Sequence, residues 1–322
     1  MRVDPMPLDL PTPDRPFRIG TRGSPLALAQ AHETRARLMA AHGLPEDAFA
    51  IVPIKTTGDR IQDRPLAEVG GKGLFTKEIE EALLAREIDV AVHSSKDMPT
   101  AQPHGLVLDA FLPREDVRDA FVTLDGRALA DLPEGAVVGT SSLRRRAQVA
   151  HRRPDLRLVE FRGNVQTRMG KLRDGVAEAT FLAMAGLNRL GMGDVPHRPV
   201  EPEEMLPAVA QGAIGIERRE DDGRAAALLA AIGDADTAAR IACERAFLAV
   251  LDGSCRTPIA GLATIAAGRI AFRGEVLSPD GAQVVETAGE AAVADAAALG
   301  AAQGAALIAR APAGFVEAAT RG

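Results

Sequence analysis

Cys255 is one of only two cysteines in this 322-residue chain, and it lies in a short run that contains glycine and proline, Asp252-Gly253-Ser254-Cys255-Arg256-Thr257-Pro258. A thiolate on an exposed loop is a nucleophile, so it can serve as a point of covalent attachment. The second cysteine, Cys243, lies in an alanine-rich stretch where a small buried residue is expected. The sequence therefore favours Cys255 as a tethering thiol.

The carboxylate of Asp97 is the second candidate, because it ends the segment His93-Ser94-Ser95-Lys96-Asp97 directly after a short apolar run, Ile88–Val92. A carboxylate at the end of a strand can protonate a leaving amine or stabilise a cation that develops on a substrate. The alternative is a turn aspartate held by Lys96. His93 is predicted to be a packed or turn histidine and not a base.

Basic residues are concentrated between Thr140 and Arg173, where ten basic and two acidic residues give a net charge of +8 in a chain of net charge −6. The cations are Arg144, Arg145, Arg146, Arg152, Arg153, Arg157, Arg162, Arg168, Lys171 and Arg173. Thr140, Ser141 and Ser142 precede a predicted helix, and their hydroxyl and N–H groups suit the carboxylates or phosphates that arginines bind. The alternative is a solvated helix face, which we expect for Arg152, Arg153 and Arg157.

The composition excludes several classes of protein. No apolar run is long enough to predict a membrane span, and the net charge of −6 argues against bulk attraction to nucleic acid. Two cysteines cannot form a disulfide framework, and they suit a cytoplasmic protein. The six histidines are scattered, so we expect no metal site. Trp and Tyr are absent, which leaves Phe as the aromatic residue that can stack on a ligand.

These residues must be positioned by a mixed α/β fold, because strand and helix signals alternate along the first two thirds of the chain. The predicted strands are Phe17–Gly20, Phe49–Thr56, Ile88–Val92, Ala136–Gly139, Leu156–Phe161, Thr180–Ala183 and Ala213–Glu217. One helix is predicted after Ser24 as N-cap and ends at Gly43, and others begin at Leu74, Ser141 and Asn164. Ligands bind such sheets outside the carboxyl ends of the strands.

The C-terminal third is predicted to form a separate α+β domain. An alanine-rich helix from Ala235 is followed by three short strands and a last helix, which are Ile259–Ile265, Ile270–Val276, Gln283–Thr287 and Ala291–Arg310. The expected organisation is a disordered proline-rich tail at 1–16, a discontinuous first α/β lobe at 17–112 and 211–230, a second α/β lobe at 113–210, and a third domain at 231–322.

From about Phe17 onward the chain resembles the porphobilinogen deaminase family, also called hydroxymethylbilane synthases. Six segments carry the resemblance in the family's order, and the cysteine loop comes last. They are Thr21-Arg22-Gly23-Ser24-Pro25-Leu26-Ala27, Gly70-Gly71-Lys72-Gly73-Leu74-Phe75, His93-Ser94-Ser95-Lys96-Asp97, Gly139-Thr140-Ser141-Ser142-Leu143-Arg144-Arg145, Arg162-Gly163-Asn164 and Leu206-Pro207-Ala208-Val209-Ala210-Gln211-Gly212-Ala213. Each segment alone is weak evidence, whereas their shared order is highly specific.

The resemblance implies two lobes like type II periplasmic binding proteins, with an active-site cleft between them, and a small C-terminal α+β domain that carries the cysteine. It also implies a dipyrromethane cofactor joined by a thioether to Cys255. Such an enzyme would be a cytoplasmic monomer that joins four porphobilinogens head to tail, releases ammonia each time and frees the linear tetrapyrrole hydroxymethylbilane. The product would pass to uroporphyrinogen-III synthase in tetrapyrrole biosynthesis.

The resemblance also assigns roles to individual residues. Asp97 would contact pyrrole N–H groups and stabilise the cationic azafulvene, while Arg22 and Arg162 would help ammonia to leave. The remaining substrate- and cofactor-binding positions would be Ser24, Lys72, Phe75, Ser94, Lys96, Thr140, Ser141, Ser142, Arg144, Arg145, Arg168 and Gln211. Phe75 could stack on a pyrrole ring, and core packing from an amphipathic helix is the alternative.

Two other classes of function compete with this interpretation. A two-lobed anion-binding protein without catalysis would explain the arginines, but it would leave Cys255 and Asp97 without a role. Nucleic-acid binding through the basic segment, Arg144–Arg173, is opposed by the net charge of −6 and by the absence of Trp and Tyr.

Overall fold

The computed structural model describes residues 8–60, 74–253 and 257–320, and the chain divides into two compact units. The first unit comprises residues 1–114 and 213–238, and the second comprises residues 115–212 and 239–322. Part of the predicted tail, residues 1–7, lies outside the described residues. From Leu8 onward the chain has defined contacts, including an isolated bridge between Thr12 and Arg15.

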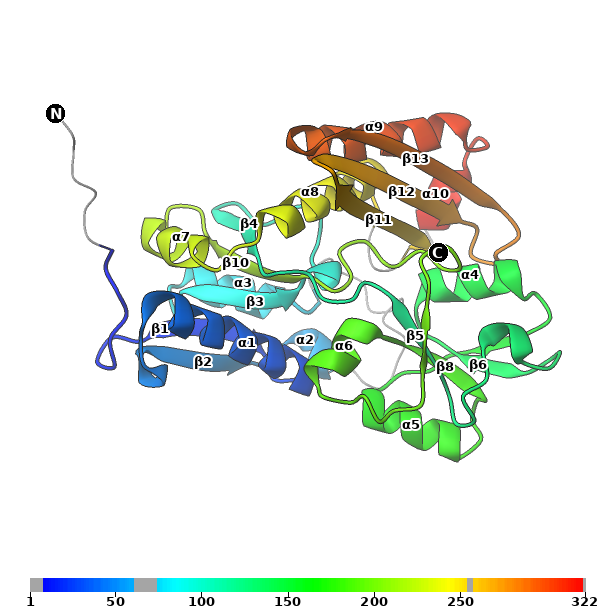
Figure 1. The fold of residues 1–322 in the computed structure, drawn as a ribbon, viewed down its shortest axis with the longest axis horizontal. Helices are drawn as coiled ribbons and strands as arrows, with labels where there is room; N and C mark the ends of the chain where they lie inside the picture. Colours follow the sequence, from blue (N-terminus) through cyan, green and yellow to red (C-terminus); the bar gives the residue numbers. More distant parts are fainter. Residues whose placement is uncertain (1–7, 61–73, 254–256, 321–322) are drawn as a thin grey trace. The chain divides into compact units, whose positions relative to one another are not determined.

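The first unit is built on a five-stranded sheet with the order β2-β1-β3-β10-β4 (Figure 1). Its strands are β1 (Phe17–Arg22), β2 (Phe49–Ile54), β3 (Val90–Ser94), β4 (Leu106–Phe111) and β10 (Ile214–Arg219). β1 pairs in parallel with β2 and β3, whereas β10 runs antiparallel between β3 and β4. The predicted return of the chain to the first lobe is therefore confirmed.

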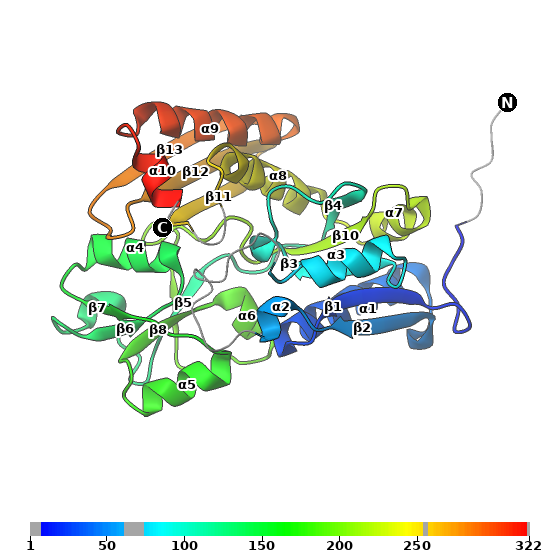
Figure 2. The same cartoon turned by 180° about the vertical axis from the view of Figure 1, so that it is seen from behind.

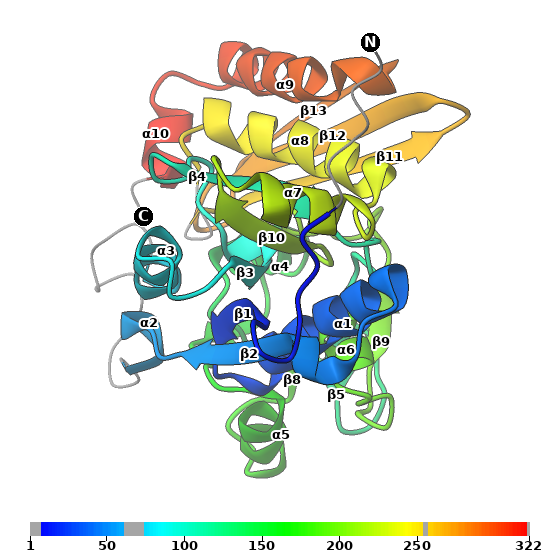
Figure 3. The same ribbon diagram turned by 90° about the vertical axis from the view of Figure 1, so that its left-hand side faces the viewer.

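Helices cover both faces of this sheet (Figure 3). They are α1 (Pro25–His42), α2 (Thr57–Arg60), α3 (Lys77–Leu84) and α7 (Gly223–Ala230), with short 3₁₀ turns η1 (Glu46–Ala48) and η2 (Ser95–Asp97). Successive side chains of a strand point to opposite faces, so Val90 and Val92 pack toward α1 and α7 while Ala91 packs toward α3.

The helix α1 shows why local signals were sufficient to predict it. The Ser24 side chain accepts a hydrogen bond from the Ala27 backbone N–H, and Pro25 occupies the first turn, where its missing N–H is harmless. Gly43 ends the helix with φ at 64°, a left-handed conformation that favours glycine. The predicted N-cap and stop of this helix are both confirmed.

The second unit contains another five-stranded sheet, with the order β7-β6-β8-β5-β9 (Figure 2). Its strands are β5 (Asp119–Thr123), β6 (Val137–Gly139), β7 (Arg157–Val159), β8 (Ala179–Ala183) and β9 (Arg198–Val200). The helices are η3 (Leu129–Asp131), α4 (Leu143–Arg152), α5 (Val165–Arg173) and α6 (Met184–Arg189). Phe121 packs with Val149 of α4, while Ala120 packs with Met169 of α5, so the two faces have separate cores.

The rest of the second unit is a three-stranded antiparallel sheet of β11 (Ile259–Ala266), β12 (Arg269–Leu277) and β13 (Val284–Ala292). It is accompanied by α8 (Ala235–Val250), η4 (Val293–Asp295), α9 (Ala296–Arg310) and α10 (Phe315–Thr320). A Cβ atom at Gly300 of α9 would lie 1.9 Å from the Cys243 carbonyl oxygen, so the close approach of α8 and α9 requires glycine. The predicted α/β lobes and α+β segment are thereby confirmed.

Several predicted boundaries differ from the observed ones. The helix predicted from Leu74 begins at Lys77, because Leu74 and Phe75 form the turn before it. The last helix begins at Ala296 and not at Ala291, since β13 continues through Ala292. β4, β5, β9, α2, α6, α7 and α10 were not predicted. Within the described residues, no helix is long and apolar enough to cross a membrane.

Candidate active site

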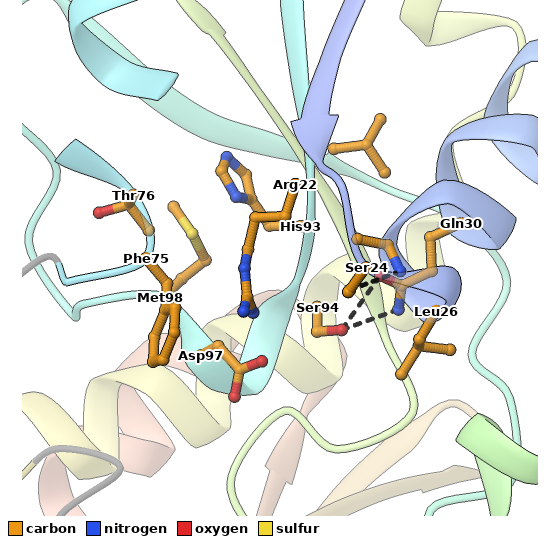
Figure 4. A pocket seen from close by; sticks show the side chains of 12 residues that line it. Arg22, Ser24, Leu26, Gln30, Phe75, Thr76, His93, Ser94, Asp97 and Met98 are labelled. Atoms are coloured by element: carbon orange, nitrogen blue, oxygen red, sulfur yellow. Dashed lines mark hydrogen bonds between the residues drawn. The ribbon is translucent and has the colours of Figure 1, made fainter. Parts of the chain in front are cut away.

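A pocket of about 70 Å³ lies in the first unit, at the carboxyl ends of the parallel strands β1 and β3 (Figure 4). This is where an α/β sheet is expected to bind a ligand. The lining residues are Arg22, Ser24, Leu26, Ala27, Gln30, Phe75, Thr76, Val92, His93, Ser94, Asp97 and Met98. The pocket brings together five residues of the sequence-based prediction, namely Arg22, Ser24, Phe75, Ser94 and Asp97.

Arg22 is held in this pocket by Asp59, which the sequence analysis missed. The Arg22 Nε atom donates to Asp59 Oδ1 at 3.2 Å, and the Thr56 hydroxyl donates to Asp59 Oδ2 at 2.7 Å. Burial alone would raise the pKa of the Asp59 carboxyl, but hydrogen bonds from Arg22 and Thr56 outweigh burial and lower it. The carboxylate therefore stays ionised and fixes the direction of the Arg22 guanidinium.

Phe75 covers Arg22, and its ring does not belong to the core of an amphipathic helix. The Arg22 Cζ atom lies 4.2 Å from the ring centroid, which is a cation–π contact. Gly58 of α2 permits this arrangement, because a Cβ atom there would lie 2.3 Å from Phe75 Cε1. Phe75 lines the pocket, and stacking of its ring on a flat ligand ring stays a prediction.

A pair of side chains joins the second turn of α1 to the end of β3. Gln30 Nε2 donates to the Ser94 hydroxyl at 2.8 Å, and the Ser94 hydroxyl lies 3.1 Å from Gln30 Oε1 (Figure 4). Ser24 caps α1 beside this pair. The positive end of the helix dipole and the hydroxyl groups of Ser24 and Ser94 make this side of the pocket suitable for an anionic group.

Asp97 ends the 3₁₀ turn η2 and presents an exposed carboxylate to the pocket. Figure 4 shows this carboxylate and the Arg22 guanidinium in the same part of the pocket, with Phe75 beside them. Among the described residues, the Asp97 side chain has no hydrogen-bond partner that would occupy it. Lys96 lies on the same turn. The carboxylate is thus available to a ligand, as its predicted role requires.

His93 forms part of the pocket wall and is buried, with 7% of its surface exposed. Its Nε2 atom lies 3.2 Å from Oε2 of Glu217, a fully buried residue of β10. The prediction of a packed histidine is therefore confirmed. The carboxylate partner was not predicted.

In the second unit, Arg144 and Arg145 converge on Asp119, a fully buried carboxylate at the start of β5. Arg145 donates to Asp119 Oδ1 through Nη2 at 2.7 Å and through Nε at 3.2 Å, and Arg144 Nη1 lies 2.8 Å from Oδ2. Burial opposes ionisation of Asp119, but the charges and hydrogen bonds of both arginines hold its pKa far below the usual value.

These two arginines are not on a solvated helix face, since only 4% of Arg144 and 7% of Arg145 is exposed. Arg144 Nη1 also donates to Gln148 Oε1 and to the Leu206 carbonyl, each at 2.9 Å. Arg145 Nη1 donates to the Phe181 carbonyl at 3.0 Å. Their side chains are therefore positioned by the protein, and their contact with a ligand stays a prediction.

Arg168, Gln211 and Ser142 lie near the same pair of arginines, while the other predicted residues of the second unit have contacts elsewhere. Arg168 Nη1 donates to the Phe181 carbonyl at 3.0 Å, and burial lowers the pKa of Arg168 to about 10, with a contribution from the charge of Arg145. Gln211 Nε2 donates to Asp119 Oδ1 at 2.9 Å. The hydroxyl groups of Thr140, Ser141 and Ser142 accept backbone N–H groups from Ser142, Phe161 and Arg145. The carbonyl of Arg162 accepts a hydrogen bond from Lys171.

Two predicted residues, Lys72 and Cys255, lie outside the described residues. The other cysteine is described: Cys243 is fully buried in α8, so the expectation of a small buried residue is confirmed. Burial raises the pKa of the Cys243 thiol to about 12, and the charge of Glu244 adds to the rise. Cys243 is therefore a poor nucleophile.

We expect Cys243 to resist alkylation in the folded protein. With a pKa of about 12, only about one thiol in ten thousand is a thiolate near pH 8, and burial blocks access to it. Peptide mass spectrometry after iodoacetamide treatment should find Cys243 unmodified in the native protein and fully modified in urea. Equal modification rates under both conditions would contradict the buried position.

Two models of one protein family match successive parts of the chain. A family model described as "Porphobilinogen deaminase, dipyromethane cofactor binding domain" matches residues 17–227, and one described as "Porphobilinogen deaminase, C-terminal domain" matches residues 238–309. The porphobilinogen deaminase of Paracoccus denitrificans is 68% identical over 308 residues, which cover 96% of this chain and 98% of that protein. That of Nitrobacter winogradskyi is 61% identical over 283 residues, which cover 88% and 90%.

Solved structures with more distant sequences also resemble this chain. A double mutant of the VFT2 domain of Bordetella pertussis BvgS is 14% identical, covers 67% of this chain and 84% of its own, and gives a TM-score of 0.40. The probable amino-acid transporter binding protein ytmK of Bacillus subtilis is 10% identical, covers 66% and 88%, and gives a TM-score of 0.40. The fold class itself comes from the strand orders and layers of each unit.

Proposed function

The chain belongs to the porphobilinogen deaminase family, and from that premise we propose that it joins four porphobilinogens head to tail into hydroxymethylbilane and releases ammonia at each step. The observation that supports this proposal is the pocket in which the Arg22 guanidinium, the Asp97 carboxylate and the Phe75 ring meet. A pyrrole that carries carboxylates and a leaving amine needs a cation, an anion and an aromatic surface in one place.

The residues of this chain fit a dipyrromethane cofactor, which when bound supplies the acceptor ring for the first substrate. Each of its pyrroles carries an acetate and a propionate, so the group is strongly anionic. In the second unit, the guanidinium groups of Arg144 and Arg145 contact the buried carboxylate of Asp119. Arg168 lies near enough to Arg145 for their charges to interact, and the buried Glu275 is a second carboxylate that interacts with Arg144. The excess positive charge in this low-dielectric environment suits such a ligand. We propose a thioether to Cys255 as its attachment.

The pocket residues have separate proposed roles. Asp97 accepts pyrrole N–H groups and stabilises the positive charge that develops on the substrate methylene carbon as the C–N bond breaks. Arg22, fixed by Asp59, binds a substrate carboxylate and orients the aminomethyl group for departure. Phe75 and the Ser24–Ser94 side of the pocket hold the ring and a second acidic group. Arg162, Lys72, Lys96, Thr140, Ser141, Ser142 and Gln211 complete the proposed binding set.

We further propose a monomeric, cytoplasmic enzyme whose product is taken up by uroporphyrinogen-III synthase. The linear product is chemically reactive, so an enzyme that closes the tetrapyrrole ring must consume it.

Intact mass of the purified protein tests the proposal, with wild type compared with Cys255→Ser. We expect an excess mass of two linked pyrrole units on the wild type alone, and further increments of one pyrrole unit after addition of porphobilinogen. Cys243→Ser is the matched control and should keep the excess mass. Bare sequence masses in all three proteins, before and after porphobilinogen, would overturn the proposal.

A further inference from the structure

Four buried polar side chains form a continuous series through the second unit. They run from Asp119 of β5 through Arg144 and Gln148 of α4 to Glu275 of β12. The exposed fractions are 1% for Asp119, 4% for Arg144, 0% for Gln148 and 3% for Glu275. Burial of polar groups is costly unless they are hydrogen-bonded, so a polar connection from α4 to β12 calls for an explanation beyond packing.

Gln148 lies in the middle of this series, and its amide group can take only one orientation. The Oε1 atom accepts from Arg144 Nη1 at 2.9 Å, and a guanidinium group has no acceptor, so the amide oxygen must face it. The Nε2 atom donates to the Leu206 carbonyl at 2.9 Å and to Glu275 Oε1 at 2.5 Å. Both amide hydrogens and the amide oxygen are therefore engaged.

These contacts anchor the Arg144 guanidinium at its Nη1 atom. Nη1 donates to Gln148 and to the Leu206 carbonyl, and it lies 2.8 Å from Asp119 Oδ2, so its two hydrogens are shared among three acceptors. Arg144 Nε is also buried, and it has no acceptor among the described residues. The protein therefore fixes one nitrogen of this guanidinium and leaves another donor for a further partner.

Glu275 places the other end of the series beside the strand that follows Cys255 in the sequence. β12 pairs with β11, and Glu275 lies opposite Ala260, five residues after Cys255. A second contact holds α4 to the turn between β12 and β13, since His151 Nδ1 lies 2.9 Å from the Gly281 carbonyl oxygen. A Cβ atom at Gly281 would lie 2.5 Å from the His151 backbone nitrogen, so helix and turn approach closely. α4 is therefore fixed to this sheet at two points.

We propose that Gln148 is a positioning residue for the cofactor, because it holds the Arg144 guanidinium in a fixed place relative to the strands that follow the tethering cysteine. Glu275 in turn fixes Gln148. This inference rests on the proposed function, because it assumes that Arg144 binds a carboxylate of the dipyrromethane attached to Cys255. A ligand held at both ends needs a constant separation between them, and an arginine that is already ordered loses less entropy when the ligand binds.

Glu275 serves as the acceptor for Gln148 whether or not it is ionised. Burial raises the pKa of the Glu275 carboxyl, while the hydrogen bond from Gln148 and the charge of Arg152 oppose the rise. Both forms of a carboxyl group have an oxygen atom that accepts a hydrogen bond. The contact depends on this acceptor and not on the charge, so glutamine in place of Glu275 should keep it.

The rate of cofactor assembly tests the assignment, with the full chain produced in cells that cannot make porphobilinogen. After porphobilinogen is added, intact mass records how fast the protein gains two linked pyrrole units. The variants are Gln148→Met, which keeps the length of the side chain without its amide, Glu275→Met and Glu275→Gln. Val276→Ala is the matched control, because Val276 is a fully buried residue of the same strand whose side chain points to the opposite face of the sheet.

We expect Gln148→Met to assemble the cofactor about 10-fold more slowly than wild type and Glu275→Met about 3-fold more slowly, since residues of one hydrogen-bond network are coupled. Glu275→Gln should stay within about 2-fold of the wild-type rate because it keeps the acceptor. Val276→Ala should be less stable in urea, because it removes buried methyl groups, and should still assemble the cofactor at the wild-type rate.

An Arg144→Lys background separates positioning from a general effect on the fold. Lysine keeps the charge but lacks the planar fork, so Gln148 has no guanidinium to hold. Gln148→Met should therefore cause no further slowing in Arg144→Lys. Equal slowing in both backgrounds, or a folded Gln148→Met variant with the wild-type rate, would overturn the assignment. If Gln148→Met does not fold, equal rates in Glu275→Met and Glu275→Gln would overturn it. Wild type that gained no pyrrole mass would refute the proposed function, and the assignment with it.

Discussion

Replacement of Asp97 by asparagine is expected to lower kcat about 10³-fold while the protein stays folded. The carboxylate is exposed in the pocket and has no partner among the described residues, so the amide breaks no internal hydrogen bond. What the substitution removes is the negative charge next to the carbon that becomes cationic when ammonia leaves. Electrostatic stabilisation of this kind acts mainly on the transition state, so kcat should fall more than substrate binding.

Steady-state ammonia release and thermal unfolding would be measured side by side. Asp47→Asn is the matched control, because Asp47 is an exposed aspartate of the same unit that lies outside the pocket. Both variants should stay within about 0.5 kcal/mol of the wild-type stability, as most exposed substitutions do. If Asp97→Asn released ammonia with a kcat close to that of wild type, the proposed catalytic role of Asp97 would be wrong.

Replacement of Asp119 by asparagine is expected to have the largest effect on stability. The amide keeps the shape of the side chain but leaves Arg144 and Arg145 buried without their ionised partner. Loss of one partner from a buried ion pair typically costs about 3–5 kcal/mol. Urea unfolding near neutral pH should therefore show a much lower midpoint for Asp119→Asn than for wild type. Asp125→Asn is the control, because Asp125 pairs with the exposed Arg127 and loss of an exposed ion pair should change the midpoint very little.

The dependence of this effect on pH follows from the direction of the pKa shift. Folding lowers the pKa of Asp119 from its usual value of 3.8, so its stabilisation is complete above that value and is lost as the pH falls further. The difference in unfolding free energy between wild type and Asp119→Asn should be constant from pH 7 to about pH 5 and shrink below about pH 4. A difference that is independent of pH would contradict an ionised Asp119.

Local sequence signals predicted the parts of the fold that local physics decides. The caps of α1 at Ser24 and Gly43 are fixed by hydrogen bonds and backbone conformation within a few residues, and both were predicted correctly. The start of α3 was wrong, because the apolar side chains of Leu74 and Phe75 continue the helical pattern although their backbone forms a turn. Periodicity reports burial, and it does not distinguish a helix from the turn that leads into it.

Partners that are distant in the sequence could not be predicted. Asp59 and Arg22 are 37 residues apart, and Asp119 and Arg145 are 26 residues apart, so only the tertiary fold brings each pair together. The same holds for His93 and Glu217, whose pairing depends on the return of β10 to the first sheet. The sequence predicted the pocket residues of the first unit that could contact a ligand. The residues that orient them, such as Asp59, were identified only in the structure.

The position of β10 determines the order in which the two sheets can be completed during protein synthesis. β10 pairs with β3 and β4 and lies between them in the first sheet, although it is encoded after every strand of the second five-stranded sheet. A ribosome that adds roughly 5–20 residues per second needs about 5–20 s to travel from the end of β4 to the end of β10. During that time the edges of β3 and β4 are unpaired, so the nascent chain exposes two strands that can associate with other chains. A product truncated before Ile214 would keep this defect permanently and is expected to be insoluble.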